Sequence, residues 1–190
     1  MLKLQIEIFT LFSFLVVSTS MNIQVTNEVI WDKPQNCPLG QYVEGFQLKT
    51  HLFEGDTRVN GIKLFCGNPY QANTSVLISS KAKSGVWGKI HVCTRDYLNG
   101  FQLMVEKYQV EGDFTASNNV RFFCSKPPRD LLEQDEFGYG SWSSVQSCDR
   151  NQFICGLQTQ YEQANVDDNH QNESIGNLHI ECCNHDLPAM

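Results

Sequence analysis

The sequence is poor in charged residues, which make up only 18% of its 190 positions. Its 14 basic residues are outnumbered by 21 acidic ones, and the basic residues form no cluster. A nucleic-acid-binding protein needs a concentrated basic surface, so we expect no nucleic acid among the partners. Tryptophan is also scarce, with three residues in the chain, and this scarcity makes the spacing of those three informative.

Motifs of the common enzyme classes are missing from the sequence. It has no Gly-x-Ser-x-Gly nucleophile motif, no phosphate-binding P-loop and no dinucleotide-binding fingerprint. No long segment shows the apolar periodicity of an amphipathic helix, and after the N-terminus none is apolar enough to cross a membrane. We therefore predict a protein without a cofactor.

The N-terminal segment has the composition of a secretory signal peptide. Lys3 is followed by an almost wholly apolar run from Ile8 to Val17 and then by the small residues Ser18, Thr19 and Ser20. The apolar run is shorter than the roughly 20 residues that span a bilayer, although a membrane anchor is the alternative. We expect residues 1–20 to be removed and the rest to form one secreted, extracellular domain without membrane contact.

The eight cysteines fit an extracellular protein. An even number of cysteines in a secretory chain predicts up to four disulfides, formed in an oxidising compartment. Two glycosylation sequons, at Asn73 and Asn172, are consistent with the same compartment.

The three tryptophans set the register of an internal repeat. Trp31, Trp87 and Trp142 follow one another at nearly equal intervals, and each stands six residues before a cysteine. Three similar stretches come next, VEGFQLKTH, LNGFQLMVE and ICGLQTQYE, and each copy closes on a cysteine in GIKLFC, NVRFFC and NLHIEC. A fixed period of this length indicates a supersecondary unit repeated three times, at about 29–75, 76–130 and 131–184.

The local pattern within each copy is that of β-strands. Phe101, Leu103 and Val105 alternate with more polar residues, so that the apolar side chains share one face. We predict that each repeat forms a small antiparallel sheet of about four strands, including the strand that begins the copy. Three such sheets around a shared axis bury their apolar faces together, so residues 21–190 form a single all-β domain.

The ordered elements of the repeat resemble one known family. Trp-x5-Cys, GFQL, an acidic turn and a terminal Cys, three times over, look like the vitelline membrane outer layer protein 1 family across roughly residues 29–184. The resemblance implies a β-prism of three Greek-key four-stranded antiparallel sheets with internal pseudo-threefold symmetry. It also implies association with extracellular coats such as the egg envelope. A transfer activity on N-acetylglucosamine oligomers has been attributed to a member of that family.

Repeat symmetry predicts how the cysteines pair. The equivalent positions give three disulfides and leave one further pair: Cys37–Cys66, Cys93–Cys124, Cys148–Cys182 and Cys155–Cys183. Cys182 and Cys183 are consecutive in a strand and point to opposite faces, so they serve different partners. The swapped pairing within the last group of four is the alternative. A second alternative is a zinc site in HIECCNHD, but the symmetric pairs favour disulfides, and we expect no metal.

Three aspartates recur at equivalent positions of the repeat, Asp56, Asp113 and Asp168. Around a threefold axis they would line a polar mouth, since sugar hydroxyls favour carboxylate partners, and they are the candidate ligand-binding residues. The competing interpretation, which we favour, is that each aspartate stabilises a turn through bonds to nearby backbone N–H groups. Asn60, Asn118 and Asn119 receive the same turn interpretation, because asparagine tolerates left-handed backbone conformations.

Other candidate chemistry is weaker. Hydrolysis of a glycoside needs two carboxyl groups about 5–10 Å apart, and the sequence supplies candidates without placing any pair. These candidates are Glu44, Glu54, Glu106 and Glu111. Tryptophan stacks well on sugar rings, but its constant distance from a cysteine favours core or rim packing beside the disulfides.

These observations favour one function over two alternatives. We expect a secreted, disulfide-stabilised, non-catalytic module of an egg-envelope-like coat, which acts through extracellular glycans or coat proteins. The first alternative is a carbohydrate-active enzyme that transfers or cleaves N-acetylglucosamine oligomers, with no catalytic residue identified. The second alternative is a lectin-like secreted defence protein.

Overall fold

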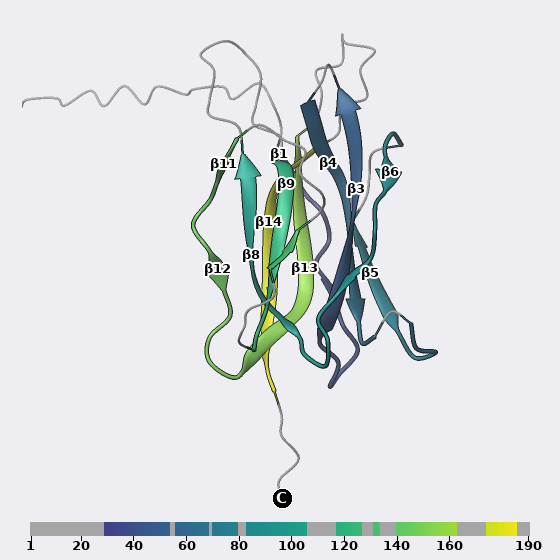
Figure 1. Ribbon diagram of the computed structural model, residues 1–190, viewed down its shortest axis with the longest axis vertical. Helices are drawn as coiled ribbons and strands as arrows, with labels where there is room; N and C mark the ends of the chain where they lie inside the picture. The colour runs from purple at the N-terminus through teal and green to yellow at the C-terminus, as the bar shows by residue number, and fades with distance from the viewer. Residues whose placement is uncertain are drawn as a thin grey trace, which may run out of the picture.

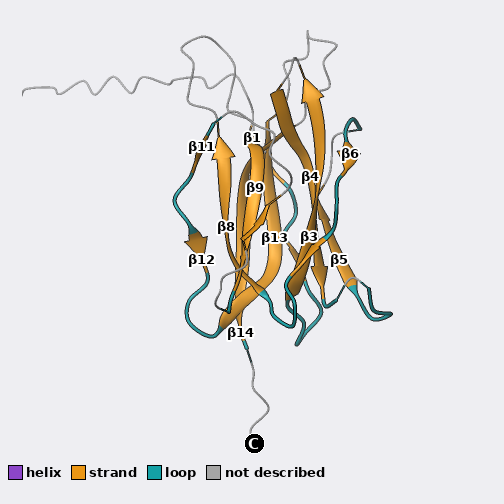
Figure 2. Ribbon diagram, in the orientation of Figure 1, coloured by secondary structure: helices purple, strands orange, loops and turns teal. Residues whose placement is uncertain are grey.

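The computed structural model describes most of the chain after the N-terminal segment, namely residues 29–53, 56–68, 70–79, 83–105, 117–126, 131–133, 140–162 and 174–185. These residues form fourteen β-strands and no helix (Figure 2). In the same part of the chain, no helix is long and apolar enough to cross a membrane. Three antiparallel sheets pack around one apolar core, so the predicted all-β class is confirmed (Figure 1).

Each sheet is built on one long hairpin, and we number the sheets by the order of these hairpins. Sheets 1, 2 and 3 contain the hairpins β3 (Val43–Phe53) with β4 (Asp56–Cys66), β8 (Leu98–Val105) with β9 (Ser117–Cys124), and β13 (Gln152–Glu162) with β14 (Ser174–Asn184). Their apolar residues alternate as predicted: Phe46 and Leu48 are fully buried, with the more polar Gln47 between them.

The strand that begins each repeat pairs with the hairpin of another repeat. In each case this segment is divided into two short strands: β6 (Val86–Trp87) and β7 (His91–Val92) on β3, β11 (Ser141–Trp142) and β12 (Gln146–Ser147) on β8, and β1 (Val29–Trp31) and β2 (Gln35–Asn36) on β13. The prediction that each repeat supplies the first strand of its own sheet is therefore wrong. The exchange is circular, because the N-terminal strands complete the last sheet.

Sheets 1 and 2 have the order of a Greek key. The third consecutive strand, β5 (Ser75–Ser79) or β10 (Leu131–Glu133), lies on the second hairpin strand, and the fourth strand returns beside the first. With the divided outer strand counted once, each of these sheets is four strands wide. Sheet 3 has β1 and β2 on β13, but within the described residues no strand pairs with the other edge of β14.

A β-bulge in the first strand of each hairpin makes room for the exchanged strand. The register shifts at Val43/Gly45, Leu98/Gly100 and Ile154/Gly156. A side chain at Gly45 would place its Cβ 2.5 Å from the carbonyl oxygen of His91, and one at Gly100 would lie 2.8 Å from that of Gln146. The glycine of the two GFQL stretches is thus required by the close approach of a neighbouring backbone, whereas Gly156 of GLQT is crowded first by the side chains of Asn36 and Glu181.

Three disulfides join the sheets into a closed ring. Cys37–Cys66 links the exchanged strand of sheet 3 to sheet 1, Cys93–Cys124 links sheet 1 to sheet 2, and Cys148–Cys182 links sheet 2 to sheet 3. The fourth bond, Cys155–Cys183, lies within the hairpin of sheet 3. These pairings are the ones that repeat symmetry predicts, and the swapped alternative does not occur.

The core draws side chains from all three sheets. The rings of Phe46 in sheet 1 and Phe122 in sheet 2 lie 4.7 Å apart between centroids, and Ile154 and Leu157 of sheet 3 belong to the same buried cluster. Full burial of one such side chain contributes about 1.5–3 kcal/mol. No sheet covers its own apolar face, so the stability of each sheet depends on the other two.

Candidate functional site

The predicted acidic ring falls largely outside the described residues. Asp56 is the first residue of β4, opposite Phe53 at the hairpin end of sheet 1. Asp113 and Asp168 lie outside the described residues, so neither the ligand role nor the turn role of the three aspartates is tested. Of the two predicted glycosylation sites, Asn73 is exposed in the turn between β4 and β5, whereas Asn172 is outside the described residues.

The asparagines of the repeat do not occupy turns. Asn60, Asn118 and Asn119 are buried within strands β4 and β9, so the turn interpretation of these residues is wrong. Asn60 and Asn118 stand at register shifts of the second hairpin strand, and Asn60 Nδ2 donates to Ser84 Oγ at 3.2 Å. Their backbone is not left-handed, since positive φ among described non-glycine residues occurs at two positions elsewhere, Arg95 and Asn151.

The outer face of sheet 1 carries a tryptophan, a cation and a glutamine in contact. Lys63 Nζ lies 3.9 Å from the centroid of the Trp87 ring and donates to Gln47 Oε1 at 3.4 Å. Gln47 Nε2 donates in turn to the carbonyl oxygen of Gly88, the residue after the tryptophan, at 2.7 Å. The glutamine of GFQL thus holds the exchanged strand in place.

The same arrangement recurs in sheet 2. Arg121 lies 4.0 Å from the centroid of Trp142 and donates from Nε to Gln102 Oε1 at 2.9 Å. Gln102 Nε2 donates to the carbonyl oxygen of Ser143 at 2.5 Å. The tryptophans therefore pack on the outer faces of the sheets, and the predicted core or rim packing beside the disulfides is wrong.

In sheet 3 the tryptophan is the most exposed of the three. Gln158 Nε2 donates to the carbonyl oxygen of Asp32, again the residue after the tryptophan, at 2.8 Å. The position of Lys63 and Arg121 is taken by His179, which faces Gln158 across the hairpin. Trp31 keeps 41% of its surface exposed, so its ring offers an apolar face to solvent.

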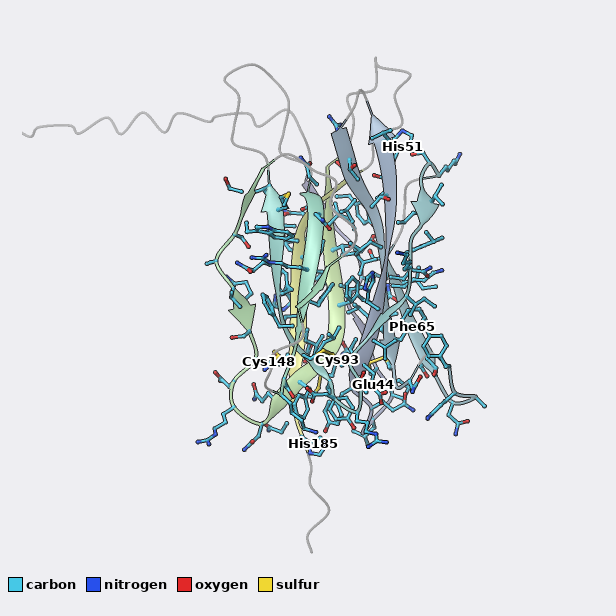
Figure 3. The ribbon with its side chains drawn as sticks, in the orientation of Figure 1. Glu44, His51, Phe65, Cys93, Cys148 and His185 are labelled. Atoms are coloured by element: carbon cyan, nitrogen blue, oxygen red, sulfur yellow. A yellow bond between two sulfur atoms is a disulfide. The ribbon has the colours of Figure 1, made fainter. Side chains whose placement is uncertain are left out.

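An aromatic cluster closes one end of the prism. Tyr42, Tyr97 and Phe153 each stand three residues before a bulge glycine, and their rings meet with centroids 4.9–5.5 Å apart. His185 contacts all three rings, and Tyr42 donates its hydroxyl to the carbonyl oxygen of Asn184 at 2.6 Å. In Figure 3 His185 lies at the end of the molecule that also holds Cys93 and Cys148, far from His51. We call this the disulfide end.

Glu44 lies at the same end and is the one candidate carboxyl group among the described residues (Figure 3). Partial burial raises the pKa of Glu44 above its ordinary value. Burial also raises the pKa of Tyr97, and the negative charge of Glu44 raises it further. The other three candidates, Glu54, Glu106 and Glu111, lie outside the described residues, so no carboxyl pair is tested.

The junction of sheets 3 and 1 is closed by polar contacts. Gln35 of β2 donates from Nε2 to the carbonyl oxygen of Ile78 at 2.7 Å and accepts the N–H of Ile78 at Oε1 at 3.0 Å, so its amide pairs with the backbone of β5. Beside it, Ser79 Oγ contacts Thr159 Oγ1, the Tyr161 hydroxyl at 2.9 Å and an Asp32 carboxylate oxygen at 3.0 Å. No motif or spacing in the sequence indicates this buried network.

The junction of sheets 2 and 3 contains a groove instead. The groove has a volume of about 500 Å³ and lies between β8 and β12 on one side and β14 on the other. Its lining combines apolar and polar side chains: Phe101, Leu103, Leu178, Ile180 and Cys182 among the former, and Ser143, Gln146, Ser147, Asn177 and His179 among the latter. Such a surface suits an elongated ligand with both apolar and hydrogen-bonding groups.

The cysteine-rich stretch of β14 is not a thiolate metal site. All eight cysteines are in disulfides, so Cys182 and Cys183 have no thiolate to offer a zinc ion. Among the described residues, no group of three histidines, cysteines or carboxylates is placed to hold a metal.

Comparisons with known proteins identify relatives along the whole described part. Residues 18–185 match the family model described as vitelline membrane outer layer protein I. The chain is 35% identical over 178 residues to the mouse vitelline membrane outer layer protein 1 homolog, covering 85% of this chain and 82% of that protein. It is 38% identical over 140 residues to the human homolog, covering 70% and 67%.

A search of solved structures finds Calystegia sepium agglutinin. It has a TM-score of 0.47 and 9% sequence identity, and the match covers 83% of this chain and 97% of the agglutinin.

Proposed function

The chain belongs to the vitelline membrane outer layer protein I family, and from this premise we propose that it is a secreted structural component of an extracellular coat. In this role it is a rigid module that contacts glycans or other coat proteins through its outer surfaces, without catalysing a reaction on them.

The ring of three inter-sheet disulfides is the observation that carries this proposal. Each bond closes a loop between neighbouring sheets, and each contributes about 3–4 kcal/mol in the chain-entropy model. Such bonds persist in an oxidising, extracellular compartment. A coat component must keep its shape outside the cell, and covalent links at every sheet junction serve that purpose.

The exposed ring of Trp31 supports contact with glycans. Tryptophan presents a large apolar face that packs against the C–H surface of a sugar. In sheets 1 and 2 the equivalent rings, Trp87 and Trp142, are covered by Lys63 and Arg121. Sheet 3 is therefore the outer face that we expect to contact a glycan.

Glycan-array binding and turnover of chitooligosaccharides, measured on one sample, test the proposal. We expect binding that Trp31→Ala weakens and the matched control Trp142→Ala leaves unchanged, with no turnover of the oligosaccharide. Turnover by the unmodified protein would overturn the proposal and favour a carbohydrate-active enzyme.

Secretion is tested separately by expression in a secreting cell. Mass spectrometry of the medium should detect a chain that begins near Met21, with a mass decrease on enzymatic removal of an N-linked glycan from Asn73. Retention of the intact N-terminus in the membrane fraction would contradict the extracellular assignment.

A further inference from the structure

The outer faces of the three sheets share one arrangement of side chains but differ at one position of the repeat. Lys63 takes this position in sheet 1 and Arg121 takes it in sheet 2, and each lies over the indole ring of its sheet, at 3.9 and 4.0 Å from the centroid. In sheet 3 the position is taken by His179, opposite Gln158 in the hairpin. Trp31 is therefore the tryptophan whose sheet has a histidine where the others have a long cation.

The register of sheet 3 places Trp31 and His179 on opposite sides of β13. Trp31 faces Gln160, two residues along β13 from the partner of His179. The two positions are thus about 10 Å apart across the sheet and about 7 Å apart along it. The same offset separates Lys63 from Trp87 in sheet 1, where the long lysine side chain bridges it. An imidazole is shorter than a lysine side chain, so it leaves space over the indole.

The exposure of the tryptophans agrees with this difference. Trp31 keeps 41% of its surface exposed, whereas Trp87 and Trp142 are more buried. The open indole face suits the C–H surface of a pyranose ring. His179 is itself exposed. A neutral imidazole donates through one ring nitrogen and accepts through the other, and a sugar hydroxyl can do both.

The neighbouring side chains favour an uncharged ligand. The polar residues nearest to this pair in the register are Gln158 and Gln160 on β13 and Asn177 and Glu181 on β14. Three of these four side chains are amides, which form hydrogen bonds with hydroxyl and acetamido groups without adding charge. The fourth, Glu181, is an exposed carboxylate that would repel an anionic sugar. The chemistry of this face therefore matches a neutral glycan.

We propose that Trp31 and His179 form a binding site for one pyranose ring of a neutral glycan, which rests on the glycan contact proposed above. The sugar ring stacks on the indole of Trp31, and a hydroxyl at its edge forms a hydrogen bond with the imidazole of His179. The residue at this position of the repeat decides whether the tryptophan is available. Lysine or arginine covers the indole, whereas histidine leaves it open and adds a hydrogen-bonding partner.

Calorimetric titration tests the site with two neutral probes, triacetylchitotriose and N-acetyllactosamine, and with sialylated N-acetyllactosamine as the anionic probe. We expect one neutral probe bound per chain and weaker binding of the sialylated probe. Trp31→Ala and His179→Lys should each lower the affinity by about tenfold, because each removes the stacked ring. His179→Gln keeps a hydrogen-bonding group and should lower it by about two- to fivefold. The matched control His51→Lys makes the same replacement on sheet 1 and should leave the affinity unchanged.

The converse substitution should create a site. Lys63→His would uncover Trp87 and place an imidazole beside it, so we expect two probe molecules bound per chain instead of one. Adding Trp87→Ala to this variant should return the number to one. Arg121→His should create a second site at Trp142 in the same way. A single bound probe in the folded Lys63→His and Arg121→His variants would overturn the proposed role of this position.

Fluorescence quenching measures the cover of the indole without any sugar. The chain has three tryptophans, so a variant with Trp87→Phe and Trp142→Phe emits from Trp31 alone. Adding His179→Lys should lower the acrylamide quenching constant by about twofold, because the new cation is attracted to the indole face. An unchanged quenching constant would overturn the proposal that this position controls access to the ring.

These measurements separate the site from the function on which it rests. Binding that requires Trp31 but is unaffected by His179→Lys would overturn the role of His179 and leave the proposed function intact. Absence of binding by both neutral probes would overturn the glycan contact of the proposed function, and this site with it.

Discussion

Two junctions of the prism use equivalent residues in different surroundings. Where sheet 3 meets sheet 1, Gln35 pairs with the backbone of β5, and a buried hydroxyl network lies beside it. Where sheet 2 meets sheet 3, the equivalent Gln146 lines a groove. The repeat fixes which side chains stand at a junction, and within the described residues an edge strand beside the junction decides what those side chains contact.

Of the changes that test the difference between the two junctions, removal of an inter-sheet disulfide should lower the free energy of unfolding most. Replacing Cys148 and Cys182 by serine opens a loop with a sequence separation of 34, and we expect a loss of about 3–4 kcal/mol in the free energy of unfolding. The equivalent change at Cys37 and Cys66 should cost a similar amount, because the separation is 29. Chemical unfolding curves of both variants give these values.

The two disulfide variants should differ in where they open. Without Cys148–Cys182, the amides around Leu178 should exchange faster, because the described residues on the two sides of the groove are joined there by this disulfide. Without Cys37–Cys66, the contact of Gln35 with Ile78 and the network at Ser79 should keep their junction closed. The two junctions would not differ as described if amide exchange near Ser79 in the variant without Cys37–Cys66 were faster than exchange around Leu178 in the variant without Cys148–Cys182.

Alanine at the bulge glycines should give the next largest effect. In Gly156→Ala the new Cβ would lie 2.8 Å from Glu181 Cβ and would meet Asn36 Oδ1, on a strand that β5 holds in place. We expect a loss of about 2–3 kcal/mol, within the range for overpacked sites. Gly100→Ala would place its Cβ 2.8 Å from the carbonyl oxygen of Gln146, in the exposed short strand β12, and should cost about 1–2 kcal/mol. Thermal unfolding that shows the larger loss for Gly100→Ala would contradict this account.

Removing one hydroxyl from the buried network should have a smaller effect. Ser79 contacts Thr159, Tyr161 and Asp32, so Ser79→Ala leaves buried polar groups with fewer partners. We expect a loss of about 1–2 kcal/mol. The control is Ser147→Ala, on the exposed strand beside the groove, which should change stability by less than about 0.5 kcal/mol. Urea unfolding measures both losses. Equal losses in the free energy of unfolding for Ser79→Ala and Ser147→Ala would contradict the stabilising role of the hydroxyl network.

A substitution at the remaining junction, between sheets 1 and 2, should change the stability of the protein least. Burial raises the pKa of Glu44, so the folded state binds this proton more tightly than the unfolded state. The folded state is then favoured at low pH, and this advantage is lost as the pH rises through the raised pKa. Glu44→Gln should therefore stabilise the protein at pH 7 by less than about 0.5 kcal/mol, and the gain should vanish below pH about 4.

Tyr97 reports on the same junction independently. The Glu44 charge adds to the effect of burial in raising the pKa of Tyr97. In Glu44→Gln the pKa of Tyr97 should fall but stay above its ordinary value, because burial of the ring is unchanged. Ultraviolet titration at alkaline pH measures this change, and an unaltered titration curve would show that the two groups do not interact.

Local features of the sequence predicted the repeat, the strands and the disulfides. Alternation of apolar residues determines which face of a strand is buried, and equivalent cysteines meet because equivalent strands do. The partner of the first strand in each copy was not predictable in this way. The alternation pattern of this first strand suits any of the three hairpins. Which hairpin it pairs with depends on how the chain connects one sheet to the next.

The errors at the tryptophans and asparagines have specific physical causes. Six residues of extended chain span about 20 Å, so Trp31 and Cys37 cannot pack together although their spacing is constant. Asn60 follows an acidic turn in the sequence, but the hairpin of sheet 1 turns before Asp56, and Asn60 is already within β4. The glycine inside GFQL was the available signal for a bulge, because an isolated glycine in a strand indicates close approach of another backbone.

The circular exchange of strands has a consequence for synthesis of the protein. Asp32 follows β1 near the start of the chain, but its bonding partner Gln158 is 126 residues further on. As the chain emerges vectorially, β1 and β2 must wait unpaired until nearly all of it has been made. The high contact order of this pairing makes formation of sheet 3 slow. Until β13 has been made, the unpaired edges of β1 and β2 are exposed to aggregation. Closure of the prism therefore depends on nearly the whole chain being available before the first strands find their place.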